Sequence, residues 1–262
     1  MLGAIIGDIV GSRFEFCDAK TKNFDFFATG CEFTDDTVMT LAIAKALLDS
    51  RGDHSKLNDL TTRHMRDIGR QYPMCGYGQI FFKWLFSDTM GPYGSYGNGA
   101  AMRVSPCGFA ANTIDAAKLY SLKVTEVTHN HLEGLKGAEA TAACVFLAKT
   151  GKSTDEIREY VDTNYYPMDF TIDGIRDNYK FDASCRNSVP QAIAAFLEST
   201  SFEDAVRNAV SLGGDSDTMA AIAGGIAEAR YGIPDDIRTR ALTFLDERLL
   251  GILEECQGGP GR

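Results

Sequence analysis

The sequence lacks long apolar runs and paired cysteines, and each absence excludes a class of protein. No segment approaches the roughly 18 consecutive apolar residues that a membrane-spanning helix needs. The seven cysteines are scattered without a Cys-x-x-Cys pair, which argues against a disulfide framework or a zinc site and favours reduced thiols. The apolar N-terminus has no basic residue before Asp8, which argues against a signal peptide. We therefore expect a cytoplasmic protein.

Basic residues are in the minority. The chain of 262 residues has 26 Lys and Arg against 36 Asp and Glu, for a net charge of −10 and an isoelectric point near 4.9. Phosphate backbones and anionic membrane surfaces repel such a chain, so nucleic acid is disfavoured as a partner and no membrane partner is expected. An apolar fraction of 44% is enough for a packed core. This balance suits an enzyme whose acidic groups hold cations.

Strand-like alternation and hairpin dipeptides are nearly absent, so the sequence predicts an all-α fold. No low-complexity or proline-rich linker divides the chain, and we expect one domain over residues 1–262 with a frayed tail at 256–262. Long loops are expected at 86–100 and 162–188. The expected helices cover residues 36–49, 134–149, 190–198, 203–211 and 217–231.

Small residues recur at every fourth position in two segments. Gly3, Gly7 and Gly11 form one row, and Ala220 and Gly224 form another that continues to position 228. Such a row lies along one face of a helix and lets a neighbouring helix approach closely. Because glycine inside a helix costs about 1 kcal/mol relative to alanine, tight packing around a central group of helices is the expected compensation.

Paired aspartates occur at two predicted helix starts near opposite ends of the chain, in "FTDDTVMT" (33–40) and "GGDSDTM" (213–219). Each pair could simply cap its helix, since an acidic residue there gains about 0.3–1 kcal/mol from the helix dipole. Two matched sets of aspartate and threonine favour a shared cation instead, because close carboxylates otherwise repel each other. Oxygen donors suit Mg²⁺, Mn²⁺ or Ca²⁺, and two ions are the natural number for the six donors. These donors are Thr34, Asp35, Asp36, Asp215, Asp217 and Thr218.

The same segments, with three others, resemble the ADP-ribosylglycohydrolase family, in the order of that family and over nearly the whole chain. The matching blocks are "GAIIGDIVGSRFEF" (3–16), "FTDDTVMT" (33–40), "GSYGNGAAMRVSPCG" (94–108), "THNHLEG" (128–134) and "GGDSDTMAAIAGGIAEARYG" (213–232). The resemblance implies a compact orthogonal helical bundle with two Mg²⁺ or Mn²⁺ ions at the base of a cleft. It assigns the six donors named above as ligands of the ions. We also expect the protein to be a monomer.

The resemblance also implies a substrate site beside the ions. The glycine-rich loop "GSYGNG" (94–99) falls where the family wraps ADP-ribose, and its backbone N–H groups are expected to approach the diphosphate. "CGYG" (75–78) looks like a companion loop. His129 matches a histidine near the substrate, and a capping or substrate-contact role suits His129 and His131 better than metal binding. Arg103 is expected to form a structural ion pair. The implied substrate-binding residues are Gly76, Gly94, Ser95, Tyr96, Gly97, Asn98, Gly99, Met102 and His129.

The implied reaction is metal-dependent hydrolysis of the glycosidic bond between ADP-ribose and an acceptor, either a protein side chain or a small molecule. Glu15, Asp36 and Asp217 are the expected catalytic residues, with Glu15 or a ligand aspartate moving the proton. A non-catalytic ADP-ribose-binding or structural member of the fold is an alternative, although such members tend to lose the acidic donors retained here. A metal-dependent phosphohydrolase is another, although no Asp-x-Asp-x-Thr follows a strand. The acceptor stays open among arginine, serine, a nucleic-acid base and a small ester.

Overall fold

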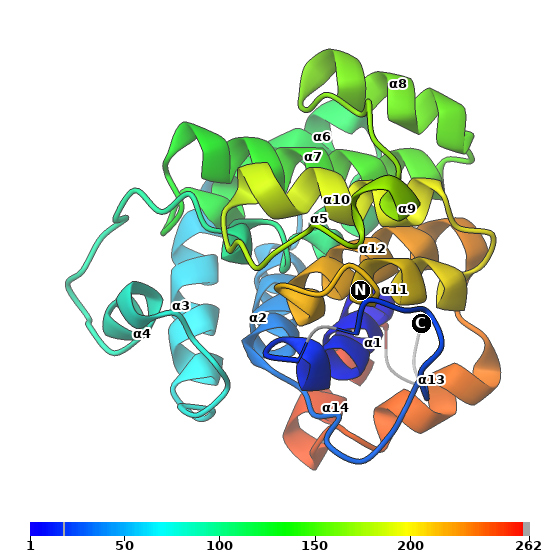
Figure 1. Ribbon diagram of the computed structural model, residues 1–262. Helices are drawn as coiled ribbons and strands as arrows, with labels where there is room; N and C mark the ends of the chain where they lie inside the picture. Colours follow the sequence, from blue (N-terminus) through cyan, green and yellow to red (C-terminus); the bar gives the residue numbers. More distant parts are fainter. Residues whose placement is uncertain (18, 259–262) are drawn as a thin grey trace.

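The computed structural model describes residues 1–17 and 19–258 of the chain. Within these ranges no β-strand forms, and one isolated bridge pairs Gly97 with Ser184, so the predicted all-α fold is confirmed. No helix in the described ranges has both the length and the apolar character to cross a bilayer. The helices, drawn in Figure 1, are α1 (Leu2–Gly11), α2 (Asp35–Ser50), α3 (Leu57–Gly69), α4 (Gln79–Leu85), α5 (Ser105–Ala110), α6 (Ile114–Thr125), α7 (Leu132–Lys149), α8 (Thr154–Asn164), α9 (Ile172–Ile175), α10 (Cys185–Leu197), α11 (Phe202–Val210), α12 (Ser216–Tyr231), α13 (Asp235–Leu242) and α14 (Glu247–Cys256).

Three predicted boundaries need correction. The segment 162–188, expected to be a loop, contains the end of α8, all of α9 and the start of α10. The helix predicted from residue 190 begins at Cys185, so Pro190 lies inside it. Proline usually starts a helix rather than interrupting one. Here packing overrides that preference, because a Cβ on Gly137 of α7 would lie only 2.6 Å from the buried Sγ of Cys185. The expected tail begins later than residue 256, since Cys256 ends α14, and residues 259–262 lie outside the described ranges.

Helices α1 and α12 cross at the centre of the protein, and their rows of small residues make the contact (Figure 1). A Cβ added to Gly7 would lie 2.0 Å from the carbonyl oxygen of Ala220, and one added to Gly3 would lie 2.3 Å from that of Gly224. Further along, the Gly3 N–H donates to Glu228 at 2.7 Å. The two backbones therefore touch directly, as the four-residue spacing predicts.

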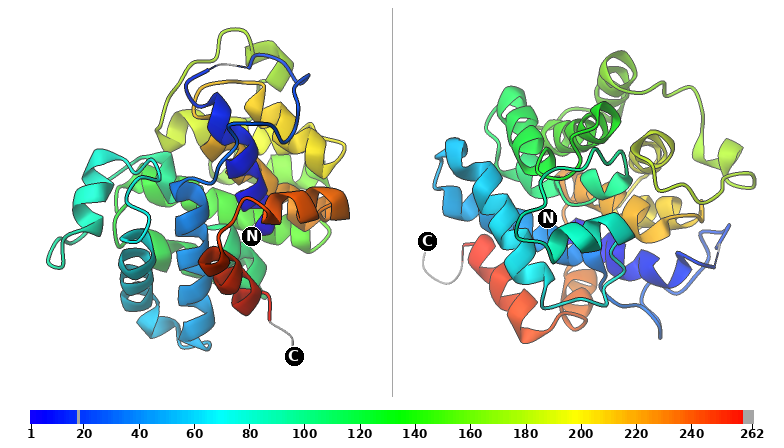
Figure 2. Two further views of the ribbon diagram at one scale, coloured as in Figure 1. Left: turned by 90° about the horizontal axis from the view of Figure 1, so that it is seen from below. Right: turned by 90° about the vertical axis from the view of Figure 1, so that its left-hand side faces the viewer.

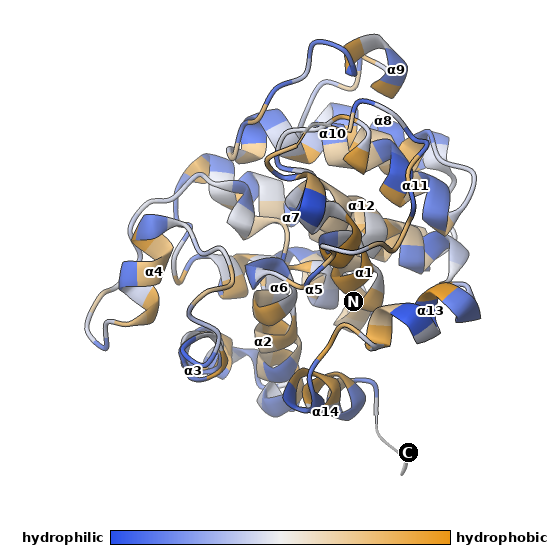
Figure 3. Cartoon of the chain, turned by 60° about the horizontal axis from the view of Figure 1, so that its bottom comes forward, coloured by the Kyte–Doolittle hydropathy of each residue, from blue (hydrophilic) through white to orange (hydrophobic). Residues whose placement is uncertain are grey.

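The core surrounds this central pair. Every residue of α1 is buried, and α2 and the first three turns of α12 are buried over most of their surface. Figure 3 shows the apolar residues of these central helices enclosed by helices with polar outer faces. Figure 2 shows that α4 and its flanking loops project to one side of this body. The central helices bring the end of α1 and the starts of α2 and α12 together inside the protein.

Candidate functional site

Two helix N-termini and the end of α1 form the base of the site. Thr34 caps α2, its hydroxyl oxygen accepting from the Asp36 N–H at 3.3 Å, and Asp215 occupies the capping position of α12. Gly213 and Gly214 precede Asp215 with φ values of +68° and +71°, a left-handed pair that residues with a side chain rarely adopt. The sharp turn aims the start of α12 at the start of α2.

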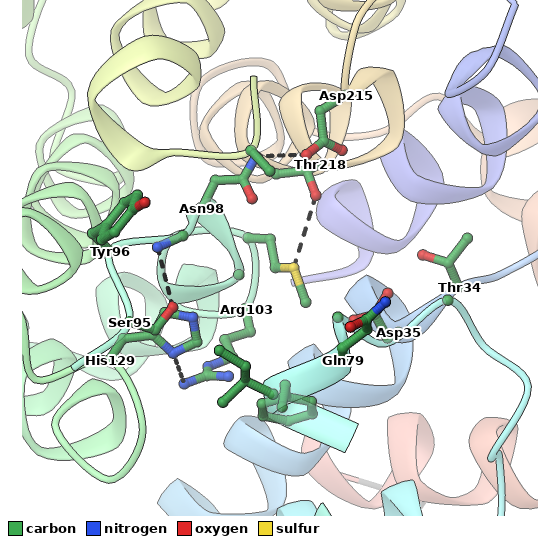
Figure 4. A pocket seen from close by; sticks show the side chains of 18 of the residues that line it. Thr34, Asp35, Gln79, Ser95, Tyr96, Asn98, Arg103, His129, Asp215 and Thr218 are labelled. Atoms are coloured by element: carbon green, nitrogen blue, oxygen red, sulfur yellow. Dashed lines mark hydrogen bonds between the residues drawn. The ribbon is translucent and has the colours of Figure 1, made fainter. Parts of the chain in front are cut away.

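The predicted acidic donors from both ends of the chain lie together. Carboxylate oxygens of Asp36 and Asp217 lie within 4.8 Å of each other and of Asp8, and a second group with the same limit joins Asp217 to Glu15 and Asp215. The Thr218 hydroxyl donates to Asp36 at 3.2 Å, which links the two helix starts directly. In Figure 4, Thr34 and Asp35 face Asp215 and Thr218 across the cleft.

Asp8 of α1 lies beside Asp36 and Asp217 and was not predicted as a site residue. Its carboxylate is 0% exposed and accepts from the N–H and the hydroxyl of Thr34, at 2.9 and 2.7 Å. It also accepts from the Thr37 N–H at 3.0 Å and from the Thr37 hydroxyl. The sequence does contain an indication of this role, because Asp8 is the one acidic residue in an otherwise apolar helix. A carboxylate buried in such a helix needs hydrogen-bond donors from elsewhere in the protein.

The electrostatics of these groups fit a bound cation. Burial, reinforced by neighbouring carboxylates, raises the pKa of Asp36 and Asp217 well above the usual range. Burial also raises the pKa of Asp8 to about 6, and burial with Asp215 and Asp8 nearby raises that of Glu15 to about 7. The Oδ2 atom of Asp36 is buried without a hydrogen-bond partner among the described residues. An oxygen-rich, crowded and partly unsatisfied cluster is what a hard divalent ion requires.

A cavity of about 740 Å³ adjoins the acidic cluster. Figure 4 shows side chains that line it. Glu15 and five of the six predicted metal donors line it, and Asp36 lies buried beneath them. Every predicted substrate-binding residue also lines it, from Gly76 through the glycine-rich loop to Met102 and His129. Seven further lining residues were not predicted to belong to the site: Gln79, Ile80, Phe81, Tyr93, Arg103, Phe181 and Ala183.

The glycine-rich loop is held in place by its own backbone. The Gly94 N–H donates to Asn130 at 2.7 Å, that of Gly97 to the Ser95 hydroxyl at 3.2 Å, and that of Asn98 to the Ala183 carbonyl at 2.8 Å. These three N–H groups therefore face the protein, and the expected approach to the diphosphate stays a prediction for the other N–H groups of the loop. The Asn98 side chain in turn donates to Asp215 at 2.8 Å, so the loop is tied to the acidic cluster.

Two expectations for single residues have different outcomes. His131 caps α7, its Nδ1 accepting from the Glu133 N–H at 3.1 Å, so its capping role is confirmed. The ion pair expected for Arg103 is wrong, because among the described residues its guanidinium meets the Thr128 hydroxyl, His129 and the Phe81 ring, and no carboxylate lies at ion-pair distance. Burial lowers the pKa of Arg103 to about 10, which leaves it charged at neutral pH.

Comparison with known proteins identifies the family. A family profile described as "ADP-ribosylglycohydrolase" matches residues 1–257. The chain is 28% identical to the ADP-ribosyl-[dinitrogen reductase] glycohydrolase of Rhodospirillum rubrum, over 95% of this chain and 89% of that one. It is 26% identical to the ADP-ribosylarginine hydrolase Tri1 of Pseudomonas putida (89% and 70%) and 25% identical to the human ADP-ribosylhydrolase ARH3 (89% and 84%). A solved "ADP-ribosylglycohydrolase-related protein complex" superimposes with a TM-score of 0.67 at 25% identity, over 96% and 93% of the chains. The chain belongs to the ADP-ribosylglycohydrolase family.

Proposed function

We propose that this protein is a divalent-metal-dependent glycohydrolase that cleaves the bond between ADP-ribose and an acceptor, releasing ADP-ribose. The observation that carries the proposal is the meeting of Asp36 and Asp217, from opposite ends of the chain, at the base of a cavity of about 740 Å³. A cavity of this size can enclose a nucleotide-sized ligand. The names of the relatives, all hydrolases of ADP-ribosyl bonds, support the same reaction class.

Six donors would hold the ions: Thr34, Asp35, Asp36, Asp215, Asp217 and Thr218. Bound Mg²⁺ or Mn²⁺ would polarise ligand oxygens and lower the pKa of a bound water. The chain itself prepares these donors, since Asp8 accepts the hydroxyl hydrogen of Thr34. The Thr34 oxygen accepts from the Asp36 N–H and keeps a second lone pair that can face a cation. Asn98 orients Asp215 by donating its amide N–H to the carboxylate at 2.8 Å. Orienting partners of this kind commonly contribute 10- to 100-fold to metal affinity.

Glu15 is suited to move the proton. It is half-buried at the cavity wall, and its carboxylate lies within 4.8 Å of Asp215 and Asp217. In hydrolysis the water oxygen bonds to C1 of the distal ribose, the bond from C1 to the acceptor breaks, and a water proton ends on the acceptor atom. Glu15 would accept that proton and pass it on, a role worth about 10²–10⁴-fold in rate. Asp36 and Asp217 would contribute as ion ligands.

The test is a panel of substrates assayed with and without EDTA. ADP-ribosylated arginine, serine and nucleic acid and O-acetyl-ADP-ribose would be incubated with the full chain, and released ADP-ribose would be separated from phosphate and AMP. We expect ADP-ribose from at least one conjugate, loss of activity in EDTA, and recovery with Mg²⁺ or Mn²⁺. Release of phosphate or AMP instead, or full activity in EDTA, would overturn the proposal.

A matched pair of variants separates the site from the fold. Asp217 and Asp59 each lie in the first turn of a helix, but Asp59 is exposed on α3. We expect Asp217→Asn to abolish release of ADP-ribose and Asp59→Asn to retain it. Binding of ADP-ribose without turnover by the unaltered chain would favour a non-catalytic member of the family.

A further inference from the structure

A buried chain of hydrogen bonds lies behind the glycine-rich loop. Arg103 and His129 are 1% and 5% exposed, yet both line the cavity. An Arg103 Nη atom donates to the Thr128 hydroxyl at 2.7 Å, and that hydroxyl lies 2.8 Å from His129 Nδ1. The same Nη atom lies 3.4 Å from His129 Nδ1. Three side chains thus form one connected group, seen in part in Figure 4.

The chemistry of the three groups sets the position of the imidazole proton. A guanidinium can only donate, so the Thr128 oxygen accepts from Arg103, and its hydroxyl hydrogen is available for donation to His129 Nδ1. A proton on Nδ1 would face the guanidinium Nη atom at 3.4 Å, which can only donate. Nδ1 must therefore accept, and in a neutral imidazole the proton then lies on Nε2.

The Nε2 atom faces the glycine-rich loop. A Cβ built on Gly99 would lie 3.5 Å from Nε2, and one built on Gly97 would lie 3.8 Å away. Either side chain would crowd the space in front of this atom. The small residues of the loop therefore leave room for a ligand atom to approach the Nε2 proton.

The groups around His129 keep the ring neutral. Burial lowers its pKa well below the usual value, and the charge of Arg103 lowers it further. Tyr93, at 6.0 Å between ring centroids, stays neutral because burial raises its pKa to about 12. From α7 the contact comes from Gly134, which carries no charge. No carboxylate of the described residues contributes to this shift, so nothing nearby favours the imidazolium.

We infer that Arg103 is a positioning residue, which acts through Thr128 to hold His129 as the neutral Nε2–H tautomer and so presents a hydrogen-bond donor to the ligand in the cleft. The identity of that ligand, an oxygen of the ADP-ribosyl group, rests on the proposed function. No carboxylate of the described residues lies at ion-pair distance from Arg103, although the charge of Asp35 acts on it from farther away. An anionic group such as a diphosphate would therefore complete the balance of its charge. The arrangement supplies a fixed donor without placing a second positive charge at the ligand.

The test is nitrogen-15 spectroscopy of the histidine rings in the metal-free, ligand-free protein. The chain has four histidines, and His129→Gln assigns the signal of interest. In the unaltered protein we expect Nδ1 unprotonated and Nε2 protonated, with no titration near the ordinary value of about 6.5. A proton on Nδ1, or an imidazolium at neutral pH, would overturn the inference. This spectrum of the unaltered protein requires neither a substrate nor a variant at Arg103.

Two variants then test the role of Arg103 and Thr128. Arg103→Met removes the guanidinium and Thr128→Val removes the hydroxyl, and in each we expect both tautomers to appear. The control is Arg66→Met, because Arg66 also stacks on an aromatic ring, Trp84, at 4.6 Å, and donates to backbone carbonyls. Arg66→Met should leave the His129 signals unchanged. An unchanged tautomer in both Arg103→Met and Thr128→Val would overturn the inference, and Thr128→Val suffices if Arg103→Met does not fold.

Kinetics separate this inference from the proposed function. With a hydrolysed conjugate, we expect Arg103→Met to raise KM about tenfold or more, the effect of a lost hydrogen bond to a charged group. An unchanged KM would overturn the claim that the donor meets the ligand. If no conjugate is hydrolysed while the Nε2–H tautomer is observed and depends on Arg103, the positioning role stands and the proposed function falls.

Discussion

The hydroxyl of Thr34 donates to the carboxylate of Asp8 at 2.7 Å, joining the cap of α2 to the interior of α1. This contact matters for cation binding, because a threonine can offer its oxygen to a metal only when its hydrogen points elsewhere. Asp8 also accepts from the backbone of Thr34 and Thr37, so it holds the first turn of α2 as a unit. The metal donors of α2 are therefore oriented by a residue of another helix.

We predict that Asp8→Asn weakens binding of Mg²⁺ about 10- to 100-fold. Asparagine places an amide N–H₂ against groups that donate to Asp8, so the Thr34 hydroxyl loses its orientation. Calorimetric titration of the metal-free protein is the measurement. Stability is a poor readout here, because removing a buried charge and removing an acceptor act in opposite directions.

The control for Asp8→Asn is Asp115→Asn, which removes an exposed acid from the first turn of α6. It should leave the affinity for Mg²⁺ unchanged. Equal affinities of the Asp8 variant and the unaltered protein would contradict the orienting role of Asp8.

We predict that Gly7→Ala destabilises the protein by at least about 2 kcal/mol, although alanine is favoured over glycine in a helix by about 1 kcal/mol. The new Cβ would lie 2.0 Å from the carbonyl oxygen of Ala220, and that backbone cannot move without moving α12. Gly251→Ala in α14 is the matched control, because no atom lies within 4 Å of its added Cβ. Denaturant titration should show Gly251→Ala to be neutral or stabilising by up to about 1 kcal/mol. Similar effects of the two substitutions would refute the close contact of α1 with α12.

We predict that the metal-free protein loses stability as the pH rises from about 5 to about 8. The folded-state pKa values of Asp8 and Glu15, about 6 and about 7, lie above those of the unfolded chain. Their stabilising protons are bound below the unfolded-state pKa and are lost as the pH rises through the folded-state values. The buried Asp8 contributes a slope of up to about 1.4 kcal/mol per pH unit, and the half-exposed Glu15 contributes less because solvent screens its charge.

Saturating Mg²⁺ should flatten this pH dependence, because the ion favours the charged carboxylates. Urea titrations with EDTA and with Mg²⁺ at several pH values provide the comparison. A metal-free protein that is more stable at about pH 8 than at about pH 5 would contradict the assignment of these raised pKa values.

We predict that Glu15→Gln lowers kcat by about 10²–10⁴-fold while the affinity for Mg²⁺ changes little. The amide keeps the size of the side chain but can neither accept nor release the proton. Steady-state kinetics with a hydrolysed conjugate, together with calorimetric titration of the metal, separate the two effects. Loss of metal binding in Glu15→Gln would instead make Glu15 a ligand.

Local patterns in the sequence predicted much of this arrangement. The "TDDT" and "DSDT" segments mark helix starts because aspartate and threonine cap helices, and both mark the ends that meet at the cavity. The row Gly3, Gly7 and Gly11 predicted a close helix contact, which α12 makes. These features depend on residues near each other in the chain, whose spacing alone carries the information.

Other contacts between distant segments were not readable, because no matching local pattern marks both partners. The role of Asp8 depends on the start of α2, and the surroundings of Arg103 depend on Thr128 and His129. The early start of α10 depends on packing against Gly137, which outweighs the preference of Pro190 for a first turn. In each case the deciding neighbour lies elsewhere in the sequence.

The most direct test of a metal centre shared by the two ends of the chain is an anomalous difference map from crystals grown with Mn²⁺. The account predicts two peaks at the base of the cavity, between the start of α2 and the start of α12, in contact with Asp36 and Asp217. Peaks elsewhere, or these carboxylates facing each other with no ion between them at saturating Mn²⁺, would contradict it.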